Sequence, residues 1–588
     1  MLLSLVLLLF AALVYSPCIG SATHHHFATL KNPMSRPSTP KPRTASSARN
    51  SQSRQPRTHA HGSTSIRNDS PRALWQQLQQ VAALVQAVQA GSSATAVLEQ
   101  MDAAHRPGVQ ALGYAVLRNL GVAQWLLGQL VQRKPPAPVQ ALLCSALALA
   151  WQSPVHKPAE PEACTNTGSG NGKQLAQPAA ATPSTTTPTA HASSATSATS
   201  ALPEYTDFTL VSQAVEAAKR HPQMQHQASL VNACLRRCLR ERARWLQRCQ
   251  QASPQGQTAL LNLPNWWLKQ LQHDHPNNAT EIALAGQQQA PMTLRVNARH
   301  MSAHTYLHTH LQAAGLSGAL TGSAGIVLHQ PCAVQHLPGF AQGWVSVQDA
   351  GAQLAAPLLL DALSARASQR AAQPAPLRLL DACAAPGGKT AHLLELANHA
   401  VTALDIDAQR SQRVVETLQR LGLQASLHTA DAATPDDWWD GKPFDGILLD
   451  APCTASGIVR RHPDIVWLRR PQDIAGLAAQ QHRLLEALWP LLAVGGVMLY
   501  CTCSVFKAEG ETQIQAFCAR HRNAKRLPAP GHLLPSSHPA HKITPENQAI
   551  NADTATNSAS SANAAQSPSI THTFEHDGFF YALLAKTD

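Results

Sequence analysis

Residues 377–396, LRLLDACAAPGGKTAHLLEL, decide the fold of the C-terminal half of this chain. The apolar run Leu377 to Leu380 predicts a β-strand, Gly387 and Gly388 predict a tight turn, and the apolar repeat that follows predicts a helix. A strand, a glycine turn and a helix in this order form the first unit of a doubly wound α/β fold. The ligand of such a fold binds at the carboxyl end of the strand, where the helix N-terminus attracts negative charge.

The same stretch also matches a phosphate-binding loop in part. Cys383 to Thr390 follows the pattern G-x-x-x-x-G-K-[ST], except that Cys383 stands where the first glycine belongs. Two later strands favour a nucleoside cofactor instead. The segment VTALDID brings Asp405 to the end of a second strand, where a carboxylate suits ribose hydroxyls, and Asp431 follows a third strand, where it can bond an adenine amino group. We therefore interpret this site as one for a nucleoside cofactor.

Two cysteines follow the next two strands of the predicted parallel sheet. The apolar strand in FDGILLDAPC ends at Asp450 and leads to Cys453, and the strand in GGVMLYCTC leads to Cys503. A lone cysteine is most often a small buried apolar residue. Two cysteines at neighbouring strand ends beside a nucleoside site indicate chemistry, because a thiolate that adds to C6 of cytosine makes C5 nucleophilic enough to take a methyl group. The thiolate needs an electropositive site, for which Lys389 is a candidate, and Asp450 can bond the polar edge of the base. Spacing alone does not say which cysteine attacks.

A set of longer motifs is shared between this chain and one known family. They are DACAAPGGKT (381–390), DID (405–407), DAPCTASGIVRRHPDIVWLRR (450–470), YCTCSVFKAEGE (500–511) and DGFFYALL (577–584), with ALGYAVLRNLG, LVNACLRR, LRVNARH and LPGFAQGWVSVQDAGAQ upstream. The chain closely resembles the RsmB (Sun/Fmu) group of RNA cytosine-C5 methyltransferases. The resemblance runs from Pro71 to the C-terminus, apart from two low-complexity insertions.

The resemblance implies a fold, a cofactor and a partner. The fold is a Rossmann-like α/β methyltransferase domain, with an N-terminal all-α NusB-like RNA-binding domain and a small α+β linking subdomain. The cofactor is S-adenosylmethionine, no metal is expected, and the partner is 16S ribosomal RNA, with the chain acting as a monomer. Transfer RNA or another ribosomal RNA site is an alternative target. A non-catalytic assembly factor is a further alternative. Every position with an expected chemical role is filled, however, and this favours an active enzyme.

The resemblance also implies roles for individual residues. Cys503, in a Thr-Cys-Ser motif, would be the nucleophile, Cys453 would help to release the product, and Asp450 would lie where cofactor and cytosine meet. DNA cytosine-C5 methyltransferases use the cysteine of their Pro-Cys motif, so only the resemblance favours Cys503 over Cys453. Cys501 stands where a small residue is more usual and puts a third thiol near the site. The expected cofactor-binding residues are Cys383, Ala384, Ala385, Pro386, Gly387, Gly388, Lys389, Asp405, Asp431 and Asp450.

Composition divides the chain into four parts. They are an apolar start and a disordered basic tail over 1–70, a helical RNA-binding domain over 71–250 with a low-complexity insertion at 153–201, a small α+β subdomain over 251–348, and the methyltransferase domain over 349–588 with a second low-complexity insertion at 525–571. The formal net charge of +12 favours a polyanionic partner.

One predicted helix of the second part concentrates basic charge. The pattern of ASLVNACLRRCLRERARWLQ (228–247) predicts a single helix with five arginines against one acid. Such a stripe can face phosphates, and a solvated polar face is an equally good interpretation. Arg236, Arg237 and Arg240 are the candidate RNA contacts.

The chain begins with an apolar run, Met1 to Tyr15, that resembles the core of a signal peptide. It is too short to span a bilayer comfortably, and no basic residue precedes it. Methylation of ribosomal RNA needs intracellular cofactor and reduced thiols, and twelve cysteines are too few for a disulfide scaffold in a chain of this length. We therefore expect a cytoplasmic protein with no membrane partner, translated from Met34.

Overall fold

The computed structural model of the chain describes five stretches of sequence, which are residues 73–152, 205–251, 254–368, 376–535 and 575–588. These stretches belong to one compact unit that runs from Pro71 to Asp588. The predictions of a disordered tail over 1–70, of an insertion at 153–201 and of a start at Met34 concern residues outside the described stretches. No helix in the described part of the chain has both the length and the apolar character that a membrane span requires.

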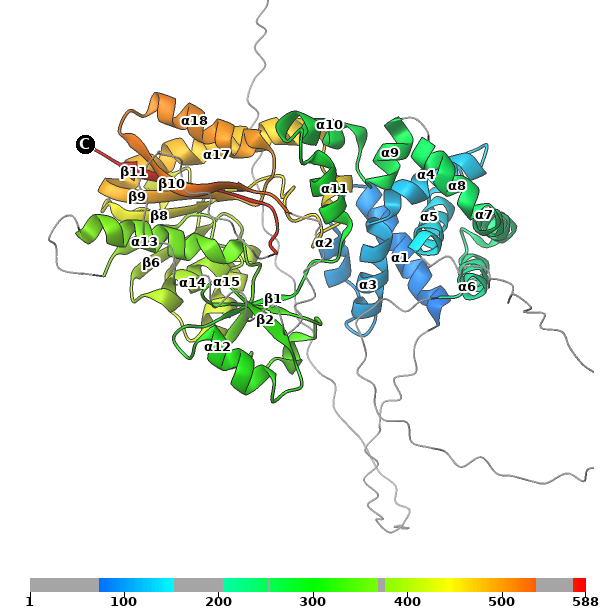
Figure 1. Cartoon of the computed structure of the whole chain (residues 1–588), viewed down its shortest axis with the longest axis horizontal. Helices are drawn as coiled ribbons and strands as arrows, with labels where there is room; N and C mark the ends of the chain where they lie inside the picture. Colours follow the sequence, from blue (N-terminus) through cyan, green and yellow to red (C-terminus); the bar gives the residue numbers. More distant parts are fainter. Residues whose placement is uncertain (1–72, 153–204, 252–253, 369–375, 536–574) are drawn as a thin grey trace, which may run out of the picture. The chain divides into compact units, whose positions relative to one another are not determined.

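The first part of the described chain is helical, as its apolar spacing predicts (Figure 1). Its elements are α1 (Leu74–Gln89), α2 (Ala94–Glu99), α3 (Arg106–Leu117), α4 (Leu120–Leu130), α5 (Ala137–Gln152), α6 (Asp207–Lys219), the 3₁₀ turn η1 (Gln225–Gln227), α7 (Ala228–Arg240), α8 (Arg242–Gln251) and α9 (Pro254–Leu260). Helix α5 is apolar on nearly every side and packs against α1, α3, α4, α6 and α7. An all-round apolar helix is stable only when its neighbours cover it, so α5 is the core of this domain.

The single helix predicted over residues 228–247 is wrong, because the chain forms two helices that meet at Glu241. Glu241 has φ −101° and ψ 16°, outside the helical region. A continuous helix would also place Arg240 and Arg244 four residues apart on one face, where like charges repel. The break instead gathers arginines around one acid, with Nε of Arg237 3.3 Å from Oε1 of Glu241.

A small antiparallel sheet follows the helical domain. Its elements are α10 (Asn265–Asp274), α11 (Ala279–Gln287), β1 (Thr293–Val296), α12 (Ala303–Thr305), η2 (Tyr306–Leu311), β2 (Gly318–Thr321), β3 (Gly325–Leu328), η3 (Val334–His336) and β4 (Val345–Val347). The strands are ordered β2-β3-β1-β4, and buried apolar side chains pack the sheet against α12 and η2. This is the small α+β module that the sequence predicts.

The C-terminal half contains a seven-stranded sheet in the order β10-β11-β9-β8-β5-β6-β7. Its strands are β5 (Arg378–Asp381), β6 (Ala400–Asp405), β7 (Ser426–Thr429), β8 (Phe444–Asp450), β9 (Leu492–Thr502), β10 (Ala524–Leu533) and β11 (Phe579–Lys586). Strands β5 to β9 are parallel, and β11 and β10 extend the sheet in antiparallel pairing. The order of the strands reverses at β5, so a ligand is expected at the carboxyl ends of β5 and its neighbours.

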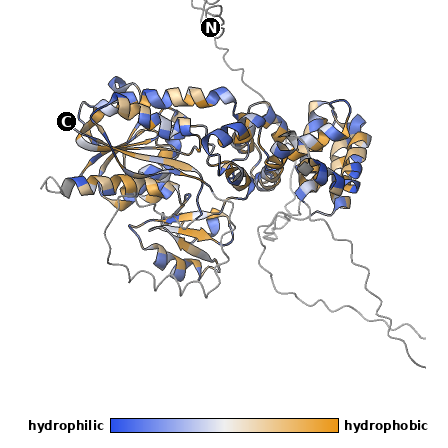
Figure 2. Cartoon of the chain, turned by 45° about the horizontal axis from the view of Figure 1, so that its top comes forward, coloured by the Kyte–Doolittle hydropathy of each residue, from blue (hydrophilic) through white to orange (hydrophobic). Residues whose placement is uncertain are grey.

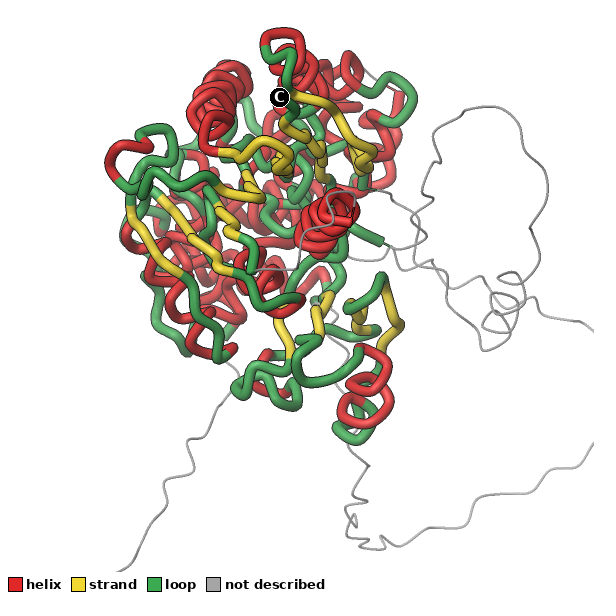
Figure 3. Tube along the Cα trace, turned by 90° about the vertical axis from the view of Figure 1, so that its left-hand side faces the viewer, coloured by secondary structure: helices red, strands yellow, loops and turns green. Residues whose placement is uncertain are grey.

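Helices cover both faces of this sheet (Figures 1 and 3). One face packs against α13 (Ala355–Ser368), α14 (Gly388–Leu396) and α15 (Ala408–Leu421), and the other against α17 (Pro471–Leu488) and α18 (Glu511–Arg520). Along β9, Leu499 and Cys501 face the first layer, whereas Met498 and Tyr500 face the second. The interior strands are therefore apolar on both sides. Figure 2 colours the chain by the hydropathy of each residue. Shorter elements in and around this domain are η4 (Ala352–Leu354), η5 (Pro435–Asp437), α16 (Ile465–Leu468), η6 (Trp489–Leu491) and η7 (Lys507–Glu509).

Strand β10 corrects part of the predicted insertion at 525–571. Residues up to Leu533 form the outer strand of the sheet and pair with β11, and residues 536–571 lie outside the described stretches. The pairing is irregular between Leu527 and Gly531, where two prolines interrupt the strand. An edge strand tolerates prolines and charged side chains because one of its sides needs no ladder hydrogen bonds. Polar composition therefore concealed this strand.

A buried ion pair joins the small sheet to the large domain. Arg295 of β1 donates from Nε and Nη2 to Glu395 of α14, at 2.9 and 2.8 Å, and both side chains are buried. Its Nη1 also donates to the carbonyl of Gly388, at 2.8 Å. The small sheet thus holds the helix that begins at the predicted cofactor loop.

We expect Arg295→Ala to lower the free energy of unfolding by about 3 to 5 kcal/mol, because it leaves the Glu395 carboxylate buried without its partner. Urea-induced unfolding measures this. Arg413→Ala is the matched control, since the Arg413–Glu99 pair is about half exposed, and its cost is expected to stay below about 1 kcal/mol. Equal costs for the two variants would contradict the importance of the buried pair.

Candidate active site

Residues 382–387 form the loop between β5 and α14, and Gly388 and Lys389 are the first two residues of α14. The sequence predicts cofactor binding over residues 383–389. Gly387 has φ +96°, and a Cβ atom there would lie 3.2 Å from Cα of Val414. Only glycine adopts this backbone without strain and leaves room for α15. The loop therefore closes tightly beneath the N-terminus of α14, whose first residue is Gly388.

The two predicted acids lie at the carboxyl ends of neighbouring strands, with Asp405 as the last residue of β6 and Asp431 just beyond β7. The Asp405 carboxylate is buried and accepts hydrogen bonds from the backbone amides of Ala385 and Asp407, both at 3.1 Å. Asp431 lies two residues past β7, and its Oδ2 accepts a hydrogen bond from Nη2 of Arg483 at 2.9 Å. Because β6 and β7 are parallel neighbours, both acids lie at the edge of the sheet that carries the loop. Arg483 was not predicted, because it comes from α17, over fifty residues away in the sequence.

A third acid, Asp381, was also missed. It is the last residue of β5, is fully buried, and accepts a hydrogen bond from Oγ1 of Thr390 at 2.6 Å. Burial, together with the charge of Asp450, raises the pKa of Asp381 to about 7. Its Oδ1 atom has no hydrogen-bond partner among the described residues. An acid at the end of an apolar strand was the available signal, the same one that identified Asp405.

Lys389 and Asp450 form an ion pair at the centre of the site. Nζ of Lys389 lies 2.5 Å from Oδ2 of Asp450, which is the last residue of β8. Burial acts to lower the pKa of Lys389, but the charge of Asp450 and the hydrogen bond with its carboxylate outweigh this effect, and the pKa is raised. Lys389 therefore stays protonated and supplies positive charge beside the cysteines.

The structure brings the two predicted cysteines together. The Sγ atoms of Cys453 and Cys503 are 3.4 Å apart. Strands β8 and β9 are parallel neighbours with Asp450 opposite Cys501, so the loops that follow them leave the sheet side by side. Cys503 comes directly after β9 and is partly exposed, whereas Cys453 is only 9% exposed.

Two further thiols of the site, those of Cys453 and Cys501, are held in their protonated form. The hydrogen bond with Cys503, followed by burial, raises the pKa of Cys453 well above its usual range. Burial and the charge of Asp450 do the same to Cys501, whose Sγ donates to Oδ1 of Asp450 at 3.5 Å. The Cys501 thiol therefore binds Asp450 and faces the layer formed by α13, α14 and α15.

The loop that carries Cys453 is held by the helical domain. Oδ2 of Asp464 accepts a hydrogen bond from the backbone amide of Ala94 at 2.8 Å, and Nη2 of Arg118 donates to the carbonyl of Arg460 at 2.7 Å. Arg469 donates from Nε to the carbonyl of Thr454 at 3.0 Å. The helical domain therefore directly contacts the loop after β8, which contains Pro452 and Cys453.

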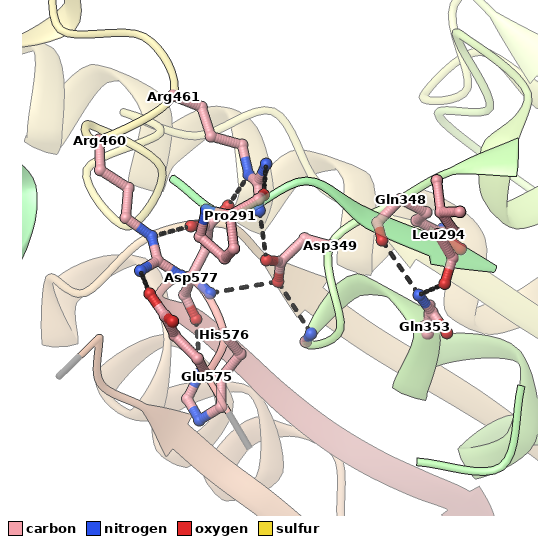
Figure 4. A network of polar contacts seen from close by, with 11 residues as sticks. Pro291, Leu294, Gln348, Asp349, Gln353, Arg460, Arg461, Glu575, His576 and Asp577 are labelled. Atoms are coloured by element: carbon pink, nitrogen blue, oxygen red, sulfur yellow. Dashed lines mark hydrogen bonds and ion pairs between the residues drawn. The ribbon is translucent and has the colours of Figure 1, made fainter. Parts of the chain in front are cut away.

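The segment before the C-terminal strand and the segment after the small sheet hold the same loop from another side (Figure 4). Asp577, fully buried, accepts hydrogen bonds from both Arg460 and Arg461. Arg460 also pairs with Glu575 at 2.6 Å, and Arg461 pairs with Asp349 at 2.7 Å. Arg460 and Arg461 thus join the loop after β8 to Asp349, which precedes it in the sequence, and to Asp577, which follows it.

Comparison with known proteins gives the family. A family model described as 16S rRNA methyltransferase RsmB/F matches residues 372–585, and one described as an RsmF/B-like, ferredoxin-like domain matches residues 263–335. A ribosomal RNA small subunit methyltransferase B from Serratia proteamaculans is 44% identical over 321 residues, which are 54% of this chain and 70% of that protein. The chain belongs to the RsmB/F family of 16S rRNA methyltransferases.

Other relatives agree with this assignment to the RsmB/F family. The protein of the same name from Pseudomonas syringae pv. tomato is 44% identical over 328 residues, which are 55% of this chain and 65% of that protein. The matched region thus spans about two thirds of the length of these relatives. The solved structure of PH0851 has a TM-score of 0.57, covers 87% of this chain and 99% of its own, and at 19% identity shows a shared fold.

Membership in the RsmB/F family confirms the family predicted from the motifs, and the fold class is confirmed as well. The expected α+β subdomain is the ferredoxin-like domain of the family. The candidate RNA contacts are three exposed residues of α7 in the helical domain, Arg236, Arg237 and Arg240. In the sequence they are distant from the loops that carry Cys453 and Cys503. Their role in RNA binding stays a prediction.

Exposure and protonation together predict which thiol reacts first. In peptide mapping after brief treatment of the full chain with iodoacetamide at pH 7.5, we expect Cys503 to be alkylated at least about tenfold faster than Cys453 or Cys501, because the thiolate is the reacting form. Lys389→Met removes the neighbouring positive charge and should slow alkylation of Cys503. Faster labelling of Cys453 than of Cys503 would contradict this order.

The raised pKa of Asp381 predicts a pH dependence of stability. The pKa of Asp381 is about 7 in the folded chain, above its value in the unfolded chain. Ionisation of Asp381 therefore costs more in the folded chain and destabilises it. Its destabilising effect is therefore absent below about pH 4 and complete above about pH 7. We expect the unfolding free energy of Asp381→Asn, relative to the unmodified chain, to rise by a few kcal/mol between pH 4 and pH 8. The exposed acid Asp436 provides the control, Asp436→Asn, and a flat difference for Asp381→Asn would contradict the prediction.

Proposed function

We propose that this chain transfers a methyl group from S-adenosylmethionine to C5 of a cytosine in 16S ribosomal RNA, with Cys503 as the nucleophile. The observation that carries the proposal is the separation of 3.4 Å between the Sγ atoms of Cys453 and Cys503, beside the Lys389–Asp450 pair. The substrate is inferred from the relatives, which are named ribosomal RNA small subunit methyltransferase B.

The residues around the end of β5 fit S-adenosylmethionine. Gly387 lets the backbone turn closely, and the N-terminus of α14 follows it directly. Asp405 and Asp431 are placed to bond the ribose and adenine parts of a nucleoside. When bound, S-adenosylmethionine supplies an electrophilic methyl group. Arg483 must share Asp431 with the adenine or move away, because it contacts that carboxylate directly.

Attack on cytosine begins at Cys503. Its thiolate forms an Sγ–C6 bond, and the electrons of the C5–C6 double bond then make C5 nucleophilic. Lys389 favours the thiolate by its positive charge, and the Cys453 thiol, kept protonated, can donate a hydrogen bond to it. Asp450 bonds the polar edge of the base and keeps C6 opposite the sulfur.

Release needs a base that removes the C5 proton once C5 carries the new methyl group. The C–H electron pair then restores the C5–C6 double bond and expels the Cys503 thiolate. Cys453 is placed for this part, because its sulfur lies beside that of Cys503. When Cys503 is a neutral thioether, it no longer raises the pKa of Cys453 through its hydrogen bond and charge. The Cys453 thiol then gives its proton to water, and the resulting thiolate accepts the C5 proton.

The proposal also covers the partner surface and the compartment. The exposed arginines of α7, Arg236, Arg237 and Arg240, are candidates to contact the phosphates of the RNA. Free thiols at the site need a reducing environment, which the cytoplasm supplies. One copy of the chain holds every residue used in the mechanism, so the chain is expected to act as a monomer.

A methylation assay tests the proposal. Unmodified 16S ribosomal RNA is incubated with the full chain and S-adenosylmethionine carrying a labelled methyl group. Cys503→Ala should lower turnover by about a thousandfold or more and form no covalent adduct, since it lacks the nucleophile. Cys453→Ala should form the adduct and fail to release it, which a denaturing gel detects as slowly migrating labelled RNA.

Two outcomes would count against this assignment. An adduct with Cys503→Ala that is absent with Cys453→Ala would reverse the roles of the two cysteines. Methylation of transfer RNA in preference to 16S ribosomal RNA would overturn the proposed substrate while leaving the chemistry in place. Cys518→Ala, which removes a partly exposed cysteine of α18, is the control for the loss of a thiol.

A further inference from the structure

The two cysteines lie in loops, so the sheet alone does not fix the distance between them. Cys453 is three residues beyond β8, and Cys503 is the first residue beyond β9. One side chain contacts both loops. It belongs to Glu509, which ends the short turn η7 and is fully buried.

The Glu509 carboxylate accepts hydrogen bonds from the residue that follows each cysteine. Oε2 accepts from Oγ1 of Thr454 at 2.5 Å and from Oγ of Ser504 at 2.6 Å. Oε1 accepts from the backbone amide of Thr454 at 2.8 Å and from Nε2 of Gln481 at 3.3 Å. Each carboxylate oxygen therefore holds two donors, and the two loops are joined through one group.

The rest of Glu509 extends the same connection into the sheet and into α17. Its carbonyl accepts hydrogen bonds from the Tyr500 hydroxyl at 2.8 Å and from Oγ1 of Thr502 at 3.3 Å. Nε2 of Gln481 also donates to the carbonyl of Pro452, directly before Cys453, at 2.9 Å. Thr454, Ser504, Gln481, Tyr500 and Thr502 are all fully buried, so water cannot replace Glu509 as their partner without opening the loops.

We propose that Glu509 is a positioning residue that sets the separation of the Cys453 and Cys503 sulfur atoms. Its importance for catalysis rests on the proposed function, whereas the separation itself is a property of the free chain. A displacement of about 1 Å at reacting groups can cost about a hundredfold in rate. The two thiols must act in turn on one base, so their separation governs both attack and release.

The chemistry of the donors predicts which substitutions preserve the connection. A glutamine amide can accept from the two N–H donors with its oxygen and donate to the two hydroxyls with its nitrogen, because a hydroxyl can accept as well as donate. Aspartate keeps the charge but is one methylene shorter and cannot reach both loops. Alanine leaves the buried amide of Thr454 without its partner, which destabilises the loop.

The first experiment measures the separation without RNA or cofactor. Diamide, an azo oxidant, takes two electrons and two protons from a pair of thiols and leaves a disulfide, and peptide mapping of the full chain follows the Cys453–Cys503 bond. We expect it to form readily in the unmodified chain, because 3.4 Å needs little movement to reach the disulfide length of about 2 Å. Glu509→Ala and Glu509→Asp should slow it at least tenfold, and Glu509→Gln less than threefold. Glu511→Gln, which changes an acid paired with Arg526 on the surface, is the matched control.

The second experiment follows methyl transfer by the same variants. We expect Glu509→Ala and Glu509→Asp to lower kcat by about a hundredfold, with the KM for RNA changed less than threefold and a larger fraction of RNA trapped as adduct. Glu509→Gln should restore most of the activity. Glu509→Asp provides the comparison if Glu509→Ala does not fold, as judged by thermal unfolding.

The outcomes separate this inference from the proposed function. If the unmodified chain forms the disulfide but methylates no RNA, the proposed function fails while the diamide series still tests Glu509. The inference is overturned if Glu509→Ala and Glu509→Asp oxidise as fast as the unmodified chain, or if no disulfide forms in any of them. Slow oxidation in Glu509→Gln, equal to that of Glu509→Asp, would also overturn it, because the hydrogen-bond connection would then not be what sets the separation.

Discussion

The parallel pairing of β8 with β9 is the constraint on which the site depends. It places Asp450 opposite Cys501 and sends the two following loops out of the same edge of the sheet. The Cys453 and Cys503 sulfur atoms meet only because both loops start from this shared register. A shift of one residue along either strand would exchange its two faces and remove the thiols from each other. The burial of these central strands on both faces keeps the register fixed.

The surrounding structure sets the charge and the order of the site. Lys389 supplies a persistent positive charge, while burial and neighbouring groups keep Cys453 and Cys501 as thiols. The loop that carries Cys453 contacts the helical domain, the segment that follows the small sheet and the segment that precedes the C-terminal strand. A protein that must present two cysteines to a base needs these loops held from several sides, because loops are otherwise the most mobile part of a fold.

Local patterns in the sequence predicted the elements that local chemistry determines. The strand, glycine turn and helix of residues 377–396 were predictable because glycine and apolar spacing act over a few residues. Cysteines at strand ends could be predicted to meet once the strands were known to be parallel neighbours. Strand β10 and the contacts of Glu509 and Arg483 could not, because each depends on partners distant in the chain. The break at Glu241 has a local signal in the spacing of its arginines, but the apolar pattern does not show it. Glu509 lies in the shared motif YCTCSVFKAEGE, but its contacts could not be predicted, since two of its donors come from Thr454 and Gln481.

The most direct test of the account identifies the atom that bonds to the base. RNA that carries 5-fluorocytidine should trap the unmodified chain after methyl transfer. A base cannot remove the fluorine that replaces the C5 hydrogen, so the adduct cannot break down. Digestion of the complex followed by mass spectrometry then shows which peptide carries the nucleotide. The account predicts a methylated nucleotide on Cys503. A nucleotide on Cys453 would contradict it.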